Sequence, residues 1–170
     1  MAAERHEVDA DALARGRALA SPLRMRILRL CLHESRTNRE LAEALDVNPG
    51  SMLHHVRALV DTGFLRAEEP RRGKRGAREV PYLATGLSWG TPVDHKAHLL
   101  LDTFLQEIEG MDPDEVTTTR LGLKLSAEHR EELLDRIAAI FEEFIDRGPD
   151  ADGDPISIFF AEHPDRQQGR

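Results

Sequence analysis

The sequence has only one cysteine, Cys31, so no disulfide can form within the chain. Cys31 lies in the largely apolar run Ile27–Leu32, which predicts a buried thiol, and a lack of disulfides is typical of a reducing compartment. No apolar run approaches the length of a membrane span, and the acidic residues among the first twenty residues are unlike a signal peptide. We therefore expect a cytoplasmic protein that does not contact a membrane.

The chain also lacks the short motifs that accompany common catalytic chemistry. It has neither a glycine-rich phosphate loop nor a nucleophile elbow. Two pairs of a histidine and a carboxylate stand one helical turn apart, Asp94 with His98 and His129 with Glu132. Most such pairs are surface contacts, because a metal site needs three or four converging ligands. We expect no catalytic residues, no metal site and no cofactor, so the chain is not predicted to be an enzyme.

Charge is divided unevenly along the chain, although the net charge is -8. Residues 15–78 contain 14 Lys and Arg against 7 Asp and Glu, a balance of +7. Residues 87–170 contain 8 against 19, a balance of -11. This asymmetry favours a nucleic-acid surface in the first half of the chain, although two solvated faces of opposite sign would give the same counts.

Capping residues divide the first half into four short helices. A first helix is expected over 8–20, and Ser21-Pro22 predicts the start of a second helix over 22–32. The sequence Thr37-Asn38-Arg39-Glu40 fits a capping box that opens a third helix reaching Leu45. Asn48 caps a fourth helix over 48–62, which Gly63 ends. Helix, tight turn and helix follow one another from Thr37 onward.

A basic loop follows these helices between two short extended segments, 64–68 and 78–84, as in a β-hairpin. The loop holds five cations in eight residues with no acid among them: Arg71, Arg72, Lys74, Arg75 and Arg78. Because such a concentration of like charge repels itself, it implies a polyanionic partner, whose phosphates or minor groove the loop would contact. The alternative is a disordered basic loop with no specific role.

The fourth helix has the pattern of a DNA-recognition helix. If Met52, Val56, Leu59 and Val60 face inward, its free face is made of small, polar and basic residues, and no acid occurs between Asn48 and Val60. Ser51 and His54 can hydrogen-bond base edges or phosphates. With the wing cations, the predicted DNA-binding residues are Thr37, Asn48, Gly50, Ser51, His54, His55, Arg57, Arg71, Arg72, Lys74, Arg75 and Arg78.

Three stretches of sequence resemble the ArsR-type winged helix-turn-helix repressors: LASPLRMRILRLC, TNRELAEALDVNPGSMLHHVRALVDTGFLR and VPYLAT. The resemblance covers residues 13–85, about half of the chain. It departs from the family pattern where Leu53 replaces the usual serine one turn before the His-Leu pair, so the family's operator sequence does not transfer. The resemblance implies a winged helix-turn-helix domain, here 8–86, in a dimer that binds a palindromic operator and releases it when an effector binds.

The second half begins with a linker at 87–92 and an amphipathic helix over 93–110. A dimer also agrees with physical reasoning, since one recognition helix reads only a few base pairs. The expected dimer interface is Trp89, Ala97, Leu100, Leu101, Phe104 and Ile108, although this face could instead pack within its own chain.

Beyond this helix, a strand at 116–125, a helix at 126–145 and a strand at 156–160 predict a β-α-β unit within 116–161. A disordered tail is expected at 162–170. The β-α-β unit could support the dimer or bind an organic effector. The fold class predicted for the whole chain is α+β and mainly helical.

The function predicted from the sequence is a homodimeric, DNA-binding transcriptional regulator, most simply a repressor. Its expected partners are duplex DNA and a second copy of the chain, and an unidentified small-molecule effector is left open. One alternative is a sensor of the same fold that responds to a metal or small molecule. Another is a protein-interaction module without DNA affinity, whose partner face would be the acidic second half.

Overall fold

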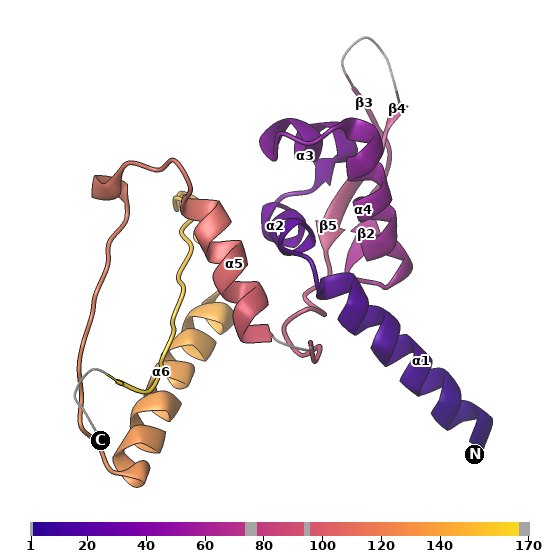
Figure 1. Ribbon diagram of the computed structural model, residues 1–170. Coiled ribbons are helices and arrows are strands. Elements are labelled where there is room, and N and C mark those ends of the chain that lie inside the picture. The colour runs from indigo at the N-terminus through magenta and orange to yellow at the C-terminus, as the bar shows by residue number, and fades with distance from the viewer. Residues whose placement is uncertain (1, 74–77, 94–95, 167–170) are drawn as a thin grey trace. The chain divides into compact units, whose positions relative to one another are not determined.

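A computed structural model describes residues 2–73, 78–93 and 96–166. The chain divides into two units, residues 1–110 and 111–170 (Figure 1). The division falls after Gly110, which has a positive φ of 79°. The helix expected at 93–110 therefore belongs to the first unit. From the sequence, we expected a linker at 87–92 to separate this helix from the winged helix-turn-helix domain.

Five helices make up most of the first unit, and local signals at the cap or first position mark the starts of three of them. Ser21 precedes Pro22 at the first position of its helix, Thr37 forms the capping box, and the Asn48 side chain accepts a hydrogen bond from the backbone of Gly50. The predicted caps at Thr37 and Asn48 are confirmed, and so is the helix start at Pro22, but the Ser21 side chain forms no cap hydrogen bond. The helices are α1 (Ala2–Leu19), α2 (Pro22–Leu30), α3 (Asn38–Ala44), α4 (Pro49–Asp61) and α5 (Lys96–Ile108).

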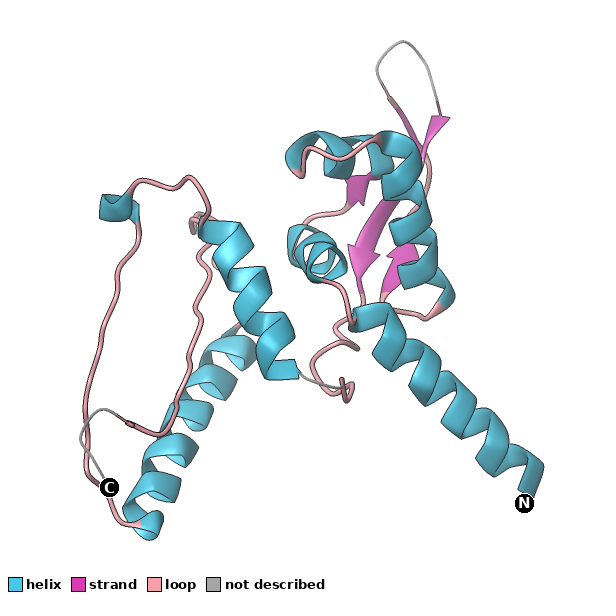
Figure 2. Cartoon of the chain, viewed as in Figure 1, coloured by secondary structure: helices cyan, strands magenta, loops and turns pink. Residues whose placement is uncertain are grey.

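The strands of this unit form a small sheet and a separate hairpin (Figure 2). The sheet has the order β1-β5-β2 and is antiparallel throughout, with β1 at Arg36–Thr37, β2 at Leu65–Ala67 and β5 at Pro81–Ala84. The hairpin pairs β3 (Arg71–Arg72) with β4 (Arg78–Glu79). Helices α2 to α4, this sheet and the hairpin together form a winged helix-turn-helix, as predicted, although β1 was not expected from the sequence.

The core of the first unit lies between the helices and the sheet. Its fully buried side chains come from every layer and include Leu19, Ile27, Cys31, Leu41, Met52, Val56, Leu59, Phe64 and Leu65. Each large apolar side chain buried in this way contributes roughly 1.5–3 kcal/mol. Gly63, with φ 79°, ends α4 in a Schellman motif: its N–H donates to Val60, and the N–H of Phe64 donates to Leu59. This turn delivers Phe64 into the core.

Helix α5 packs against α2 within the first unit. Arg29 of α2 and Glu107 of α5 form an ion pair of 3.0 Å, and Thr103 is the buried residue of α5. Leu101 and Leu105 remain exposed. The predicted helix is therefore confirmed over Lys96–Ile108, and part of it packs within its own chain.

The second unit is built around one long amphipathic helix, α6 (Ala127–Arg147), preceded by a 3-10 turn, η2 (Pro113–Glu115). Ser126 caps α6 by accepting a hydrogen bond from the backbone of His129. The helix prediction is confirmed, but the β-α-β prediction is wrong, because residues 116–125 and 156–160 form no strand. Apolar alternation predicts a strand only where a partner strand is available, and the described part of this unit supplies none.

The C-terminal segment is partly held in place. Arg130 of α6 donates two hydrogen bonds to the carboxylate of Glu162, at 2.9 and 2.7 Å, so Glu162 does not behave as the start of a disordered tail. Residues 167–170 lie outside the described part of the chain. None of the helices described is both long and apolar enough to cross a membrane.

Candidate nucleic-acid interface

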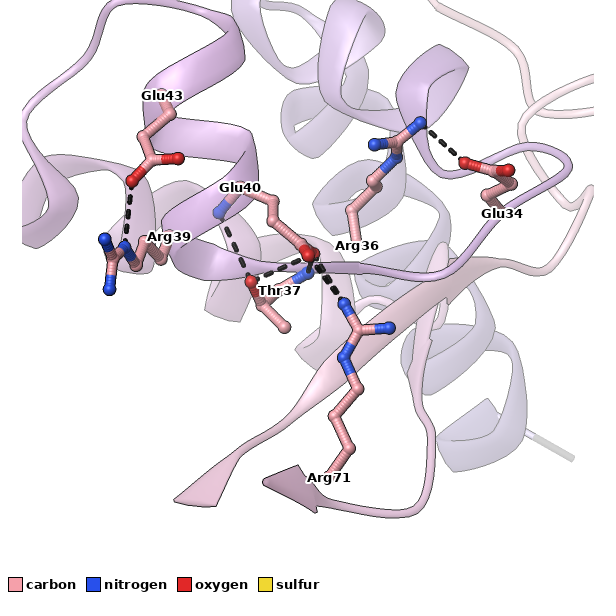
Figure 3. A network of polar contacts seen from close by, with 7 residues as sticks. All are labelled: Glu34, Arg36, Thr37, Arg39, Glu40, Glu43 and Arg71. Atoms are coloured by element: carbon pink, nitrogen blue, oxygen red, sulfur yellow. Dashed lines mark hydrogen bonds and ion pairs between the residues drawn. The ribbon is translucent and has the colours of Figure 1, made fainter. Parts of the chain in front are cut away.

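The first turn of α3 fastens the base of the β3–β4 hairpin (Figure 3). The carboxylate of Glu40 accepts hydrogen bonds from the backbone and the hydroxyl of Thr37, at 2.7 and 3.0 Å. The same carboxylate accepts two hydrogen bonds from one nitrogen of Arg71, at 2.6 and 2.9 Å. Because Arg71 lies in β3, a single carboxylate both completes the capping box and ties the hairpin to α3.

The same turn of α3 also holds the start of α4. The side-chain amide of Asn38 donates to the backbone carbonyl of Pro49 at 2.9 Å. Neighbouring residues of α3 thus bond to the hairpin base and to the first residue of α4. Figure 1 shows the hairpin and the start of α4 toward the same end of this unit.

Hydrogen bonding sets the charge state of Glu40. The backbone N–H of Thr37 is the main cause that lowers the pKa of Glu40; partial burial opposes it, and the Thr37 hydroxyl and the charges of Arg71 and Arg36 add to it. Glu40 is therefore ionised at neutral pH and neutralises Arg71. Beside it is an open hollow of about 340 Å³ lined by Glu34, Ser35, Arg36, Glu40 and Arg71. Because Glu34 also pairs with Arg36, this hollow has little net charge to attract an anion.

The free face of α4 is small and polar at its start. Met52, Val56 and Leu59 are buried, as predicted. Five of the predicted DNA-binding residues are exposed along the helix and its cap: Asn48, Gly50, Ser51, His54 and Arg57. A helix start with small exposed residues allows close approach to a groove, and its free backbone N–H groups favour a phosphate.

Two other predicted DNA-binding residues are not on this free face. Thr37 is only 2% exposed, and its hydroxyl is engaged in the capping box. His55 is half-buried, and its Nδ1 atom is buried without a hydrogen-bond partner among the described residues. Burial, and then the charges of Arg24 and His54, lower the pKa of His55, so its ring is neutral near pH 7. These two residues lie on the packed side of their elements.

The hairpin presents two cations directly opposite each other. Arg72 and Arg78 are register partners of β3 and β4, and both are exposed. Glu79 is the register partner of Arg71 and brings one acid to the hairpin base. Lys74 and Arg75 lie outside the described residues. Among the described cations of the wing, Arg72 and Arg78 are thus the best placed to meet phosphates, whereas Arg71 holds the base.

The residues predicted for the dimer interface fall into two groups. Trp89 is 65% exposed, and Ala97 and Leu101 are also exposed. Leu100, Phe104 and Ile108 are half-buried. Leu105, which was not among the residues predicted for the interface, is exposed as well. Over the described residues, no three potential metal ligands cluster together.

Comparisons with known proteins agree with a helix-turn-helix. Residues 19–68 match the family model described as a helix-turn-helix domain, which is under a third of the chain. No curated protein matches the chain. Among solved structures, reduced HlyU from Vibrio cholerae shares 19% identity over 64% of this chain and 98% of its own, with a TM-score of 0.40.

A second solved structure is Mb0332 from Mycobacterium bovis, described as a homodimeric winged helix-turn-helix DNA-binding domain and a possible ArsR-family transcriptional regulator. It shares 20% identity over 68% of this chain and 94% of its own, with a TM-score of 0.42. A MarR transcriptional regulator from Methanosarcina mazei shares 14% identity over 86% and 95%, with a TM-score of 0.35. At these TM-scores the likeness establishes nothing further, and the fold rests on the elements described above.

Proposed function

We propose that this chain is a transcriptional regulator that binds duplex DNA through α4 and the β3–β4 wing. The observation that carries the proposal is the shared anchor at the first turn of α3. Asn38 bonds to the start of α4, and Glu40 bonds to the base of the wing, so a polar helix start and the hairpin that carries a pair of exposed arginines are both tied to the same turn of α3. A common attachment of this kind favours simultaneous contact with a groove and with flanking phosphates.

In this proposal α4 enters the major groove with its first two turns. Ser51 and His54 contact base edges, and the helix start with Asn48 binds a phosphate. Arg72 and Arg78, with Lys74 and Arg75 of the loop between them, contact flanking phosphates or the minor groove. No acidic residue occurs from Asn48 to Val60, so the only acid of α4 is Asp61 at its last position, at the opposite end from the turns that would enter the groove.

The proposed regulator is a homodimer of ArsR type that recognises a palindromic operator and acts as a repressor. Two copies related by a two-fold axis double the number of base pairs read. The side of α5 that carries Leu101, with Trp89 and Ala97, is exposed and can form a dimer seam. The half-buried residues Leu100, Phe104 and Ile108 would complete that seam.

Removal of the exposed wing arginines tests the proposal. The double variant R72A/R78A should weaken binding to every duplex, because each arginine removed leaves about one phosphate without a contact. Each phosphate contact contributes roughly 0.9 to the slope of log K against log salt, so the magnitude of the slope should fall by about 2 per protomer and by about 4 for a bound dimer. Fluorescence anisotropy with a labelled duplex over a range of salt concentrations measures both quantities.

The matched control is R136A/R147A in α6, which removes the same charge from two exposed arginines that pair within their helix. Its salt slope should equal that of the wild-type chain. Equal slopes for both double variants would reject the wing as the phosphate-binding element. A wild-type chain with no affinity for any duplex in low salt would reject DNA binding altogether.

A further inference from the structure

The hairpin of the wing has two faces that differ in charge. Because Arg71 and Glu79 are directly opposite in the register of β3 and β4, their side chains share one face, which we call the mixed face. Arg72 and Arg78 are the next pair in that register, so their side chains share the other face, the basic face, and both are exposed. Among the described residues of these two strands, the single acid therefore lies on the mixed face.

The mixed face of the hairpin lies toward α3. Arg71 donates two hydrogen bonds to the carboxylate of Glu40, at 2.6 and 2.9 Å, which sets the direction of this face (Figure 3). The hydrogen bond and charge of Glu43, and then the charge of Glu79, raise the pKa of Arg39, an exposed cation of the same helix. The mixed face thus contributes a cation that binds an acid of α3 and an acid that attracts a cation of α3.

The carboxylate of Glu79 lies across the hairpin, against the backbone of Gly73. A Cβ atom added to Gly73 would overlap the carboxyl carbon and both carboxyl oxygens of Glu79. The φ of Gly73 is not in the left-handed region, so this dihedral angle does not require a glycine. The position of the carboxylate supplies a physical reason for the glycine, because any side chain at residue 73 would displace that carboxylate.

We propose that Glu79 is a positioning residue of the wing, whose carboxylate, placed against Gly73, keeps phosphates away from the mixed face and leaves the basic face to contact DNA. A carboxylate in this place repels a phosphate that approaches the mixed face, and it offsets part of the charge of Arg39. On the basic face, a phosphate meets two exposed arginines that are direct register partners.

This inference rests on the proposed function and names the residue that orients the wing on the duplex. Specific recognition often includes a group that repels the wrong arrangement as well as groups that attract the right one. A wing that binds phosphates with both faces can lie on a duplex in two ways. Repulsion at the mixed face favours the arrangement in which α4 and the basic face bind the duplex together.

Removal of the Glu79 charge tests the proposal through the salt dependence of binding to a labelled duplex of random sequence. In E79Q the repulsion at the mixed face is lost, so Arg39 can contact one further phosphate. The magnitude of the slope of log K against log salt should then rise by about 0.9 per protomer. The affinity of E79Q relative to the wild-type chain should accordingly fall about 3.5-fold per protomer between about 50 and 200 mM salt.

The matched control is E69Q, which removes the same charge from an exposed glutamate between β2 and β3. E69Q should bind the random duplex with the salt slope of the wild-type chain. An unchanged slope in E79Q, or an equal rise in E79Q and E69Q, would overturn the proposal.

A second substitution tests the position of the carboxylate itself. G73A keeps every charge but displaces the carboxylate, so it should raise the slope in the wild-type background and add nothing in a chain that already carries E79Q. An effect of G73A that is the same in both backgrounds would overturn the proposal. Failure of the proposed function is recognised separately, because R72A/R78A would then have the salt slope of the wild-type chain.

Discussion

Replacement of Glu40 should lower the stability of the folded chain by an amount that can be estimated from the interactions of its carboxylate. The substitution E40A removes the hydrogen bonds to Thr37 and the ion pair with Arg71 together. Loss of a helix cap costs about 1 kcal/mol. The side chains of Glu40 and Arg71 are 38 and 47% exposed, so solvent screens their ion pair to about 0.2–1 kcal/mol. E40A should therefore lower the free energy of unfolding by about 1–2 kcal/mol.

Two further variants separate these contributions. E40Q keeps a side chain that can complete the capping box but loses the charge, so it should cost less than E40A, within about 1 kcal/mol. E43A removes another carboxylate of the same helix, which among the described residues pairs with exposed Arg39, and should cost at most about 0.5 kcal/mol. Urea unfolding followed by circular dichroism measures all three. Equal losses for E40A and E43A would refute the reasoning.

The effect of Glu40 should also depend on pH in one direction. Because its pKa is lowered in the folded chain, its contribution to stability is complete above the ordinary glutamate value of 4.5 and is lost as the pH falls through the lower, folded value. The difference in stability between wild-type and E40A should therefore shrink in acid. A difference that stays constant from pH 7 down to pH 3 would contradict the assigned hydrogen bonds.

Two other predictions concern base reading and the thiol. S51A or H54A should change the preferred operator at one or two positions by about 1–3 kcal/mol, as selection from random duplexes would reveal; an unchanged motif for both would assign them to positioning alone. Burial raises the pKa of Cys31 from 9.0 to about 11, which lowers its thiolate fraction about a hundredfold at neutral pH. A thiol reagent should thus modify the chain only after denaturation, and rapid reaction of the folded chain would contradict this burial.

The first unit was predictable because its signals are local. Pro22, the capping box at Thr37, Asn48 and Gly63 act within one helical turn, so the sequence alone places the helix ends within a few residues. Strand β1 was not predicted, because a strand of two residues is too short to show an alternation of apolar and polar residues. It is a strand because it pairs with β5. The strands predicted in the second unit failed for a related reason: alternation does not supply a partner.

The candidate interface was predictable only in part. Residues on the free face of α4 follow from helical periodicity, as Ser51 and His54 illustrate. The engagement of Arg71 by Glu40, 31 residues away, depends on tertiary structure and leaves no local signal. The half-burial of His55 likewise depends on tertiary structure, since α4 packs against α2, and periodicity within α4 does not reveal it.

The Glu40 carboxylate both completes the capping box and binds Arg71, and this has a consequence for redesign of the wing. Glu40 binds Arg71 at the base of the wing, so we expect that the loop between β3 and β4 can be lengthened, shortened or replaced while the attachment of the hairpin to α3 is kept. By contrast, a residue inserted between Arg71 and β2 would release the wing from α3 without touching any cation. To change the DNA sequence that the proposed regulator prefers, residues of the wing loop should therefore be changed before residues at the base of the wing.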